Sequence, residues 1–384
     1  MADQLTHAVL VLNAGSSSIK AALIGQDAHG QRRRLWQDQR PWAAAGQGPA
    51  ANGLSQAIGA CLDPWLAKAL QPWQGQLGLV AHRVVHGGAR YTAPTRLTPE
   101  VMAGIRHTQE LAPLHNGVAL AVIHWMAHWL PSWHSELEQW ACFDTAFHHT
   151  LPEAASTYAI PEPWRRQGLR RFGFHGLNHQ HVSETVAAIL HEEGGSAEQA
   201  QRLRLISCHL GAGSSLCAIA GGRSVATTMG FTPLEGLVMA TRSGSVDPGL
   251  LLHLLLETGL SPQELSDGLN HQGGLLGLSG LSGDMRQLRQ AADQGHAGAQ
   301  LALEVFTQKL LEGIGAMASA LRGVDVIALS GGIGQHDEQL AHTLMQELAW
   351  LGPFRLLQIP ADEEGQIAQQ CLAANHGQTN LAPS

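Results

Sequence analysis

The sequence is poor in charge, and that scarcity excludes one broad class of function. Only 14% of its 384 residues are charged, and 31 acidic residues against 23 lysines and arginines give a formal net charge of -8. Proteins that bind nucleic acid neutralise its phosphates with many lysines and arginines. We therefore expect no nucleic-acid partner.

Long apolar runs are missing as well. The longest aliphatic stretch, at 249–256, is far shorter than the roughly 20 residues that a membrane-spanning helix needs. The N-terminal segment lacks the basic stretch followed by a long apolar core that is typical of a signal peptide. These absences predict a cytoplasmic protein without a membrane partner.

Cysteines are few and scattered, and no two of them form a C-x-x-C pair. Of the five, Cys142, Cys208 and Cys217 lie in strand-like runs, where a free thiol behaves as a small apolar residue. This pattern fits a reducing compartment better than a disulfide framework.

What the chain does contain is enough apolar sequence for two folded domains, at 44% of its residues. Residues 8–12 read AVLVL, and a turn rich in glycine and serine joins them to a second apolar run. The same pattern recurs at 203–220, and the tetrapeptide AGSS occurs in both turns. The repeated pattern of strand, turn and strand predicts a duplicated fold with one copy in each half.

A third buried strand, at 324–329, precedes the glycine turn SGGIG and a helical pattern over 337–351. This order favours an α/β fold. Helix starts are predicted at Thr98, with proline following it, and at Ser261, where a capping box is present. Residues 26–76 are expected to form loops and short helices, and 191–202 a solvated connection.

The turn between the first two strands has the composition of an anion-binding loop. It combines a glycine with Asn13, Ser16, Ser18 and Lys20. Glycine lets the backbone approach an anion closely, and successive backbone N–H groups bind it. An ordinary hairpin turn explains the same residues about as well. The second turn, 209–215, could hold phosphates in the same way, although it lacks the spacing of a Walker A loop.

Two arginines lie in segments rich in glycine, and one aspartate lies between aromatic residues. Arg83 precedes a glycine pair, and Arg242 is followed by Ser243 and Gly244. A planar guanidinium in such a segment suits carboxylate or phosphate recognition, although a lone arginine more often forms a surface ion pair. Asp144, flanked by phenylalanines, is expected to be paired or functional because an unpaired buried charge is costly.

Several of the 22 histidines lie close together in the sequence, which raises the alternative of a zinc site. The candidates are His148, His149, His175, His179 and His181. No cysteine or carboxylate stands at ligand spacing from them, so a structural role is favoured for most of these histidines.

Taken in order, these segments resemble the acetate kinase family, within the superfamily of actin, Hsp70 and the sugar kinases. The strings that carry the resemblance run from 9 to about 368 and are LNAGSSSIK, HRVVHGG, FDTAFH, FGFHG, HLGAGSS, MGFTPLEG, TRSG, DP, SGGIG and DEE. The resemblance implies a duplicated ribonuclease-H-like fold with an active-site cleft between two lobes. The N-terminal lobe is expected at 1–148, with 365–384 packing back on it, and the nucleotide-binding lobe at 149–364.

The resemblance also implies roles for matched positions. Arg83, Asp144, His175 and Arg242 would act in phosphoryl transfer from ATP to acetate. Phosphates and nucleotide would be bound by Asn13, Ser16, Ser18, Lys20, His209, Gly211, Gly213, Gly331, Gly332 and Ile333. Asn13 and Glu363 would help to place Mg²⁺ or Mn²⁺, and a homodimer is expected.

A small apolar pocket for the methyl group of the acid is implied at Val85, Leu114, Phe174 and Pro233. The size of Val85 favours acetate, but one methylene is discriminated by only ~1–3 kcal/mol, so propionate is expected to react too. Direct in-line transfer is expected, because a carboxylate is already deprotonated at neutral pH and needs no strong base.

The sequence departs from the family pattern at Ala212, Ser245, Gln335 and His336, where Asn, Asp, Glu and Asn are usual. These departures leave rate and choice of donor open. The alternatives are a propionate or butyrate kinase, a pyrophosphate-dependent relative, and a nucleotide-binding module with little turnover. The sequence does not determine the physiological direction of the reaction.

Overall fold

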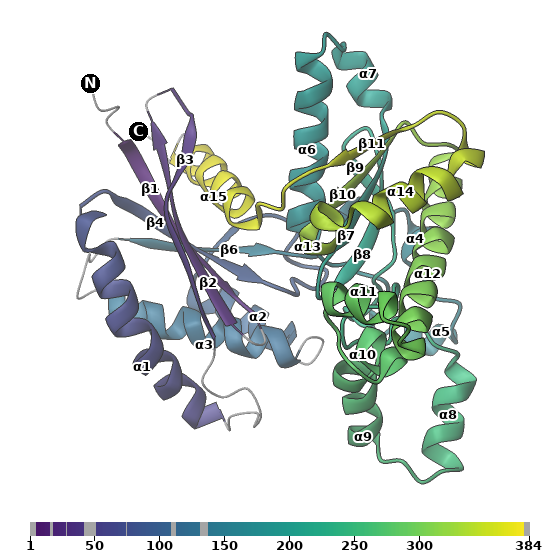
Figure 1. Cartoon of the computed structure of the whole chain (residues 1–384). Helices are drawn as coiled ribbons and strands as arrows, with labels where there is room; N and C mark the ends of the chain where they lie inside the picture. Colours follow the sequence, from purple (N-terminus) through teal and green to yellow (C-terminus); the bar gives the residue numbers. More distant parts are fainter. Residues whose placement is uncertain are drawn as a thin grey trace. The chain divides into compact units, whose positions relative to one another are not determined.

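The computed structural model describes residues 5–15, 18–27, 29–41, 51–73, 75–108, 113–130 and 137–379. Side chains are described throughout these ranges except at 5–7, 51–57, 113–115 and 377–379. The chain divides into two compact units (Figure 1). Unit 1 comprises Met1–Ala146 and Asp362–Ser384, and unit 2 comprises Phe147–Ala361. No helix in the described ranges is both long enough and apolar enough to cross a membrane.

Unit 1 is built on a six-stranded sheet with the order β3-β2-β1-β4-β6-β5. The strands β1 and β2 form the predicted antiparallel hairpin, and β1, β4 and β6 run parallel. The strands are β1 Leu5–Ala14, β2 Ser18–Asp27, β3 Arg32–Pro41, β4 Leu77–Val84, β5 Thr95–Arg96 and β6 Glu138–Phe143. The helices are α1 Ala51–Leu70, α2 Pro99–His107, α3 Pro113–Trp129 and α15 Glu363–Thr379, and η1 Gln71–Trp73 is a short 3-10 turn.

Helices cover both faces of this sheet. Alternate β1 residues, among them Leu10 and Leu12, pack in one core cluster with Ile58 of α1 and Val122 of α3. The intervening positions of β1 face the other way, because successive strand residues point to opposite faces. That second face is covered by α15, which contacts β1, β4 and β6. Residues from the C-terminal end of the chain therefore lie against the first strand.

Unit 2 repeats this plan in a five-stranded sheet with the order β11-β10-β7-β8-β9. The strands β7 and β8 form the second predicted hairpin, and β7, β10 and β11 run parallel. The strands are β7 Arg204–Leu210, β8 Ser214–Ala220, β9 Arg223–Thr227, β10 Val326–Ser330 and β11 Arg355–Gln358. The order β9-β8-β7-β10-β11 matches β3-β2-β1-β4-β6 in both sequence order and direction, which confirms the predicted duplication.

Helix α6 packs against one face of the second sheet, and α12 packs against the other. The helices before β7 are η4 Ala146–Thr150, α4 Glu153–Ser156, α5 Glu162–Arg165, α6 Gly176–Glu192 and α7 Ala197–Arg202. Those after β9 are α8 Pro248–Leu256, α9 Pro262–Asp267, η5 Gly268–Gln272, α10 Gly274–Ser279, α11 Met285–Asp293 and α12 Ala297–Leu321. After β10 come α13 Gly331–His336, α14 Glu338–Glu347 and η6 Ala349–Leu351.

The structure confirms both predicted helix starts. The Thr98 side chain accepts from the Val101 N–H with Pro99 at the first helical position, and Ser261 and Glu264 form a reciprocal capping box. One local prediction was wrong, because the region 26–76 contains the ten-residue strand β3 and the twenty-residue helix α1. The connection 191–202 is mostly exposed, as predicted, and its residues 197–202 form the capped helix α7. Strand pairing with β2 and core packing by α1 outweigh the local Gly, Gln and Pro content.

Candidate active site

Three of the predicted site residues lie at the ends of neighbouring parallel strands in unit 1. Asn13 is near the end of β1, Arg83 is near the end of β4, and Asp144 directly follows β6. Because β1 pairs with β4 and β4 with β6 in parallel, their carboxyl ends meet at one edge of the sheet. Ligands of open α/β sheets bind at this edge.

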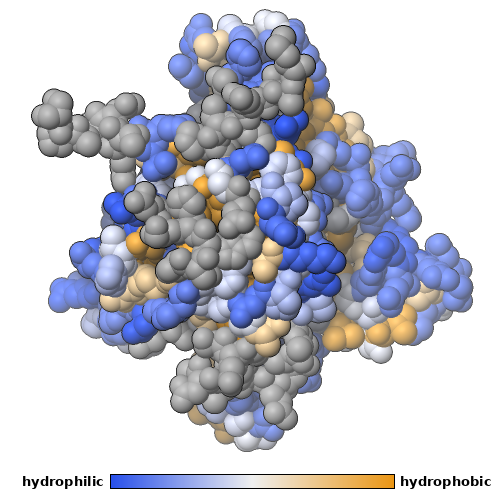
Figure 2. Space-filling model, turned by 90° about the vertical axis from the view of Figure 1, so that its left-hand side faces the viewer, coloured by the Kyte–Doolittle hydropathy of each residue, from blue (hydrophilic) through white to orange (hydrophobic). Residues whose placement is uncertain are grey.

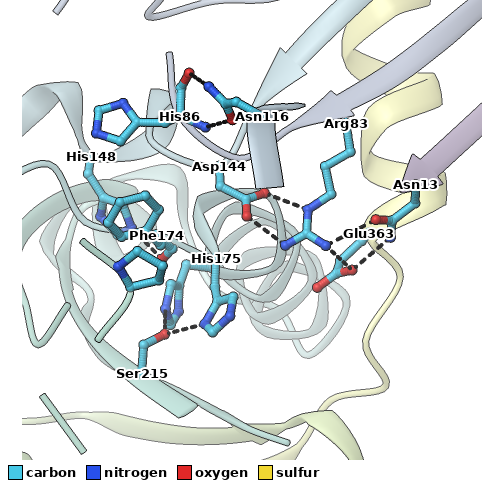
Figure 3. Close-up of polar contacts among 12 residues, drawn as sticks. Asn13, Arg83, His86, Asn116, Asp144, His148, Phe174, His175, Ser215 and Glu363 are labelled. Atoms are coloured by element: carbon cyan, nitrogen blue, oxygen red, sulfur yellow. Dashed lines mark hydrogen bonds and ion pairs between the residues drawn. The ribbon is translucent and has the colours of Figure 1, made fainter. Parts of the chain in front are cut away.

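Arg83 and Asp144 form a bidentate pair at that edge (Figure 3). The Arg83 Nε donates to Asp144 Oδ1 at 2.9 Å, and its Nη2 donates to Oδ2 at 2.6 Å. The Nη1 group donates to Asn13 Oδ1 at 3.0 Å. The Asp144 side chain is only 2% exposed and that of Arg83 16%. Asp144 therefore fixes the guanidinium plane in one orientation.

The charge of Arg83 is secured by its neighbours. Burial disfavours the cation, but the attraction of Asp144, Glu363 and Glu364, with the hydrogen bonds that Arg83 donates to Asp144, outweighs burial and raises the pKa of Arg83 above its ordinary value. Burial also raises the pKa of the Asp144 carboxyl, and Arg83 opposes that rise. Arg83 is consequently a permanent cation in a poorly hydrated place.

Two carboxylates from the start of α15 complete the unit 1 cluster. Asn13 Nδ2 donates to Glu363 Oε2 at 3.2 Å and to Glu364 Oε1 at 2.8 Å. Glu363 Oε2 also lies 3.8 Å from Arg83 Nη1. Three carboxylates, those of Asp144, Glu363 and Glu364, thus surround a single arginine. The sequence reasoning missed Glu364, although the acidic pair at a helix start was a usable signal.

The first glycine turn is described in part. The Gly15 N–H donates to the Ser18 carbonyl at 2.8 Å, and Ser18 Oγ accepts from Gln39 Nε2 at 2.8 Å. Lys20 is exposed and lies directly across from Asn13 in the β1–β2 register, which puts both side chains on one face of the sheet. The predicted Ser16 lies outside the described residues.

Polar side chains hold the glycine pair that follows Arg83. The Asn116 amide bonds both backbone groups of His86, donating to its carbonyl at 2.9 Å and accepting from its N–H at 3.0 Å (Figure 3). The Gly87 N–H donates to Thr145 Oγ1 at 3.0 Å. Val85 is buried just before this turn. The predicted Leu114 belongs to α3, but its side chain lies outside the described ones.

The second cluster lies in unit 2, where the structure brings together His175, His209, Gly213 and Arg242. The rings of His175 and His209 have centroids 4.3 Å apart. A Cβ atom added to Gly213 would lie 2.6 Å from Arg242 Nη2 and 3.2 Å from His175 Nε2. The Arg242 guanidinium and the His175 ring therefore both lie against the backbone of Gly213, so the second glycine turn and these two side chains form one site.

The backbone conformation of His175 and a hydrogen bond to its Nδ1 fix the orientation of its ring. It adopts a left-handed backbone conformation, with φ 56°, at the start of α6. Its Nδ1 lies 2.9 Å from Ser215 Oγ (Figure 3). The same hydroxyl lies 2.8 Å from Nε2 of buried His179. The Nδ1 of His179 in turn contacts Ser207 Oγ at 2.8 Å. Burial lowers the pKa of His179 well below its ordinary value, so this histidine is a neutral support.

His148 has a comparable supporting role. Its Nε2 contacts the Phe174 carbonyl at 2.9 Å, and its Nδ1 contacts Ser224 Oγ at 2.9 Å. Since a carbonyl can only accept, Nε2 carries the proton. Burial lowers the pKa of His148 to about 4. Of the histidines that raised the zinc alternative, His148, His175 and His179 thus bond to serines or a carbonyl, and His181 bonds to the Pro360 carbonyl.

Arg242 is oriented by the backbone of the FTPLEG segment. Its Nη1 donates to the Pro233 carbonyl at 2.7 Å. The Gly236 N–H donates to Ser245 Oγ at 3.0 Å, and the Ser245 N–H donates to the Gly236 carbonyl at 2.9 Å. Ser245, one of the departures from the family pattern, therefore ties the Arg242 segment to the segment that contains Pro233.

The third glycine segment lines a cavity of about 910 Å³ in unit 2. Contrary to the sequence-based expectation of a glycine turn before the helix, Gly331–His336 is itself the short helix α13. Gly331 enters it with φ 80°, a conformation that favours glycine, and a side chain there would also meet the Leu210 backbone. Predicted residues of the cavity wall are Gly211, Gly332 and Ile333; residues that sequence reasoning missed are Asp284, Met285, Arg286 and Arg289.

The chain is similar to known proteins in both sequence and structure. Residues 8–371 match the model of the acetokinase family. The chain is 41% identical to an acetate kinase of Synechococcus sp. (strain JA-2-3B'a(2-13)), over 94% of this chain and 98% of that protein. Among solved structures, the acetate kinase of Porphyromonas gingivalis superposes with a TM-score of 0.75 at 29% identity, covering 96% of this chain and 99% of that one. A propionate kinase of Francisella tularensis superposes with a TM-score of 0.80 at 30% identity, covering 95% and 98%.

Proposed function

Because the chain belongs to the acetokinase family, we propose that it transfers the terminal phosphoryl group of ATP to the carboxylate of acetate, giving acetyl phosphate and ADP, and catalyses the reverse reaction. An oxygen of the acid bonds to the γ-phosphorus as the bond from that phosphorus to the bridging oxygen breaks. No phosphoenzyme is needed, since the acid is already a deprotonated nucleophile.

The observation that carries this proposal is the grouping of Arg242, His175 and His209 around Gly213. Phosphoryl transfer requires positioning and stabilisation of charge on the equatorial oxygens more than it requires a strong base. Arg242 and the Nε2 of His175 both lie beside the glycine turn, where they can reach one anion. We assign them to the phosphoryl group in transfer, and His209, Gly211 and Gly213 to the phosphates behind it.

The unit 1 cluster has a complementary charge. Among the contacts described it combines one arginine, which suits an anion, with three carboxylates, which suit a cation. We assign Arg83 to the carboxylate of the acid, with Asp144 as its orienting partner. Asn13, Ser16, Ser18 and Lys20 are assigned to the phosphates at the first turn.

Magnesium is the metal that this carboxylate set suits. No group of three or more His, Cys, Asp or Glu side chains in the described ranges is arranged as a ready-made metal site. Glu363 and Glu364, joined through Asn13, offer hard oxygen ligands, and Mg²⁺ commonly takes one or two carboxylates with water and substrate phosphates. When bound, Mg²⁺ or Mn²⁺ would neutralise phosphate charge.

The cavity of unit 2 is assigned to the nucleoside of ATP. Its wall combines backbone at Gly211 and Gly332 with the side chain of Ile333, which packs against the core. Asp284 and Arg286 add polar groups at the rim through their own ion pair. A cavity lined by small apolar residues together with charged and polar side chains suits a purine and ribose.

For the acid, we propose acetate, with its methyl group bound by Val85, Leu114, Phe174 and Pro233. Val85 and Phe174 are 6% and 1% exposed. The likeness to a propionate kinase keeps that acid as the second candidate. A comparison of kcat/KM for acetate, propionate and butyrate decides between them, and a higher value for propionate than for acetate would reverse the assignment.

We also propose that two copies of the chain associate through α8. Separately, we propose that the protein works in the cytoplasm. Six of the nine residues of α8 are leucine, and none of the nine is buried. Leu250, Leu252 and Leu256 are 47%, 57% and 74% exposed. A leucine surface of this kind needs cover in water, and a second copy supplies an identical face. The five free thiols suit a reducing compartment.

The central experiment measures acetate-dependent acyl phosphate with hydroxylamine as the trap. Arg242→Ala should lower kcat by about 100-fold or more, the loss expected for one stabilising group, with unchanged circular dichroism. Arg202→Ala, which removes an exposed ion pair in the same unit, is the matched control and should keep full activity. ATP binding without any acyl phosphate from the wild type would favour a nucleotide-binding module instead.

A further inference from the structure

The segment 230–236 of unit 2 is folded around the carboxylate of Glu235. One oxygen of Glu235 accepts from the Tyr158 hydroxyl, and the other pairs with Arg171 Nη2. A Cβ atom on Gly230 would overlap both Glu235 Oε2 and the Tyr158 hydroxyl, so the backbone at Gly230 lies directly on this pair. The Glu235 side chain therefore packs back against the start of its own segment, at Gly230.

Tyr158 and Arg171 also form hydrogen bonds with backbone groups on the N-terminal side of Pro233. The Tyr158 hydroxyl accepts from the Phe231 N–H at 2.9 Å. Arg171 Nη1 donates to the carbonyls of Thr228 and Met229, both at 2.9 Å. Two effects raise the pKa of Tyr158: burial, which is the larger, and the hydrogen bond to Glu235. The hydroxyl therefore stays protonated and donates to Glu235.

These contacts hold the chain on both sides of Pro233. On one side Phe231 is held by Tyr158, and on the other Glu235 is held by its own two bonds. Pro233 itself has no N–H, and its carbonyl receives the Arg242 guanidinium at 2.7 Å. The position of that carbonyl, and with it one nitrogen of Arg242, depends on the held segment.

We infer that Glu235, acting through Tyr158 and Arg171, is a positioning residue for Arg242. The inference rests on the role proposed above for Arg242. Glu235 bonds to Tyr158 and Arg171, and it acts on Arg242 through the segment that carries the Pro233 carbonyl. Misplacement of a catalytic group by about 1 Å can cost two orders of magnitude in rate, so releasing the segment should lower kcat while the fold persists.

The test uses Glu235→Gln, which keeps the side-chain shape and removes the charge that pairs with Arg171, and Tyr158→Phe, which removes the hydroxyl. For both we expect kcat to fall about 10-fold to 100-fold, with KM for ATP changed less than threefold. Glu193→Gln is the control: it removes a carboxylate paired with Arg355 in the same unit, far from Pro233 in sequence, and should keep wild-type kinetics.

A double-mutant cycle separates positioning from a merely structural role. If Glu235 acts through Arg242, Glu235→Gln should reduce kcat no further in an Arg242→Ala background, because the group that it positions is gone. An equal fold-loss in both backgrounds, or a lowered Tm with wild-type kcat, would overturn the inference. Full activity of Arg242→Ala alone would instead refute the proposed role of Arg242.

Discussion

Arg83 donates two parallel hydrogen bonds to Asp144, at 2.9 and 2.6 Å, across the ends of two neighbouring strands. The strands are paired in register, with Arg83 opposite Cys142. The pair therefore depends on sheet topology as much as on the two side chains. Its geometry explains why an aspartate placed between phenylalanines tolerates burial.

Breaking this pair should harm both stability and activity. Asp144→Asn leaves the Arg83 cation buried without its charge partner, so we expect the free energy of unfolding to fall by about 3–5 kcal/mol in urea titrations. Turnover should fall about 100-fold or more. Glu100→Gln, which removes the exposed partner of Arg90 in the same unit, should leave both quantities nearly unchanged. An Asp144→Asn protein of wild-type stability would show that the buried Arg83 cation does not depend on the charge of Asp144.

Metal affinity should depend on the carboxylates at the start of α15. Glu363→Gln is expected to raise about tenfold the concentration of Mg²⁺ that gives half-maximal activity, since one of few hard ligands is lost. Binding of Mn²⁺ in the presence of ADP, followed by electron paramagnetic resonance, should weaken by a similar factor. Glu347→Gln, at an exposed position of α14, is the control. Unaltered Mn²⁺ binding in Glu363→Gln would remove this residue from the metal site.

The free energy of unfolding should decrease as the pH is lowered, because two buried histidines are neutral in the folded protein. Burial lowers the pKa of His82 and His148 from 6.5 to about 4. Their contribution is complete above pH 6.5 and is lost as pH falls toward 4, because the unfolded chain takes up protons first. Each contributes roughly 3 kcal/mol over that window. Denaturant titrations of His148→Gln should show a shallower decline between pH 6.5 and 5 than the wild type, and parallel curves would contradict this assignment.

Thiol reactivity should distinguish one cysteine from the other four. Cys142, Cys208, Cys217 and Cys371 are fully buried, while Cys61 is partly exposed. Burial raises the pKa of the Cys217 thiol to about 12 and that of Cys142 well above its usual value, so few reactive thiolates form. Ellman's reagent should therefore modify about one thiol quickly in the native protein and all of them in guanidinium chloride. Cys61→Ser should abolish the fast phase, and its persistence would mean that another thiol is accessible.

Association through α8 should be sensitive to charge on its leucine face. The double change Leu252→Glu and Leu256→Glu places two like charges on that face and should shift sedimentation from dimer to monomer. Leu301→Glu, at an exposed leucine of α12, is the matched control and should stay dimeric. A wild type that sediments as a monomer at micromolar concentration would refute the proposal.

Much of the site was predictable because its chemistry is local in the sequence. Asn13, Arg83 and His209 each stand where an apolar strand gives way to a glycine turn, so their place at a sheet edge followed from pattern alone. Tyr158, Arg171 and Glu235 were missed for the opposite reason. Their contacts join residues 64 and 77 positions apart, and no local pattern marks such a partnership.

The sequence by itself determined the duplicated order of strands, because apolar runs and glycine turns repeat and burial of those runs allows few alternatives. The sequence also identified the cationic side chains that could bind a phosphate. Tertiary structure decided which of these side chains meet. Asp144 became the partner of Arg83, and Glu364 reached Asn13 across 351 positions, because parallel pairing and the packing of α15 bring distant strand ends and a helix start to one edge.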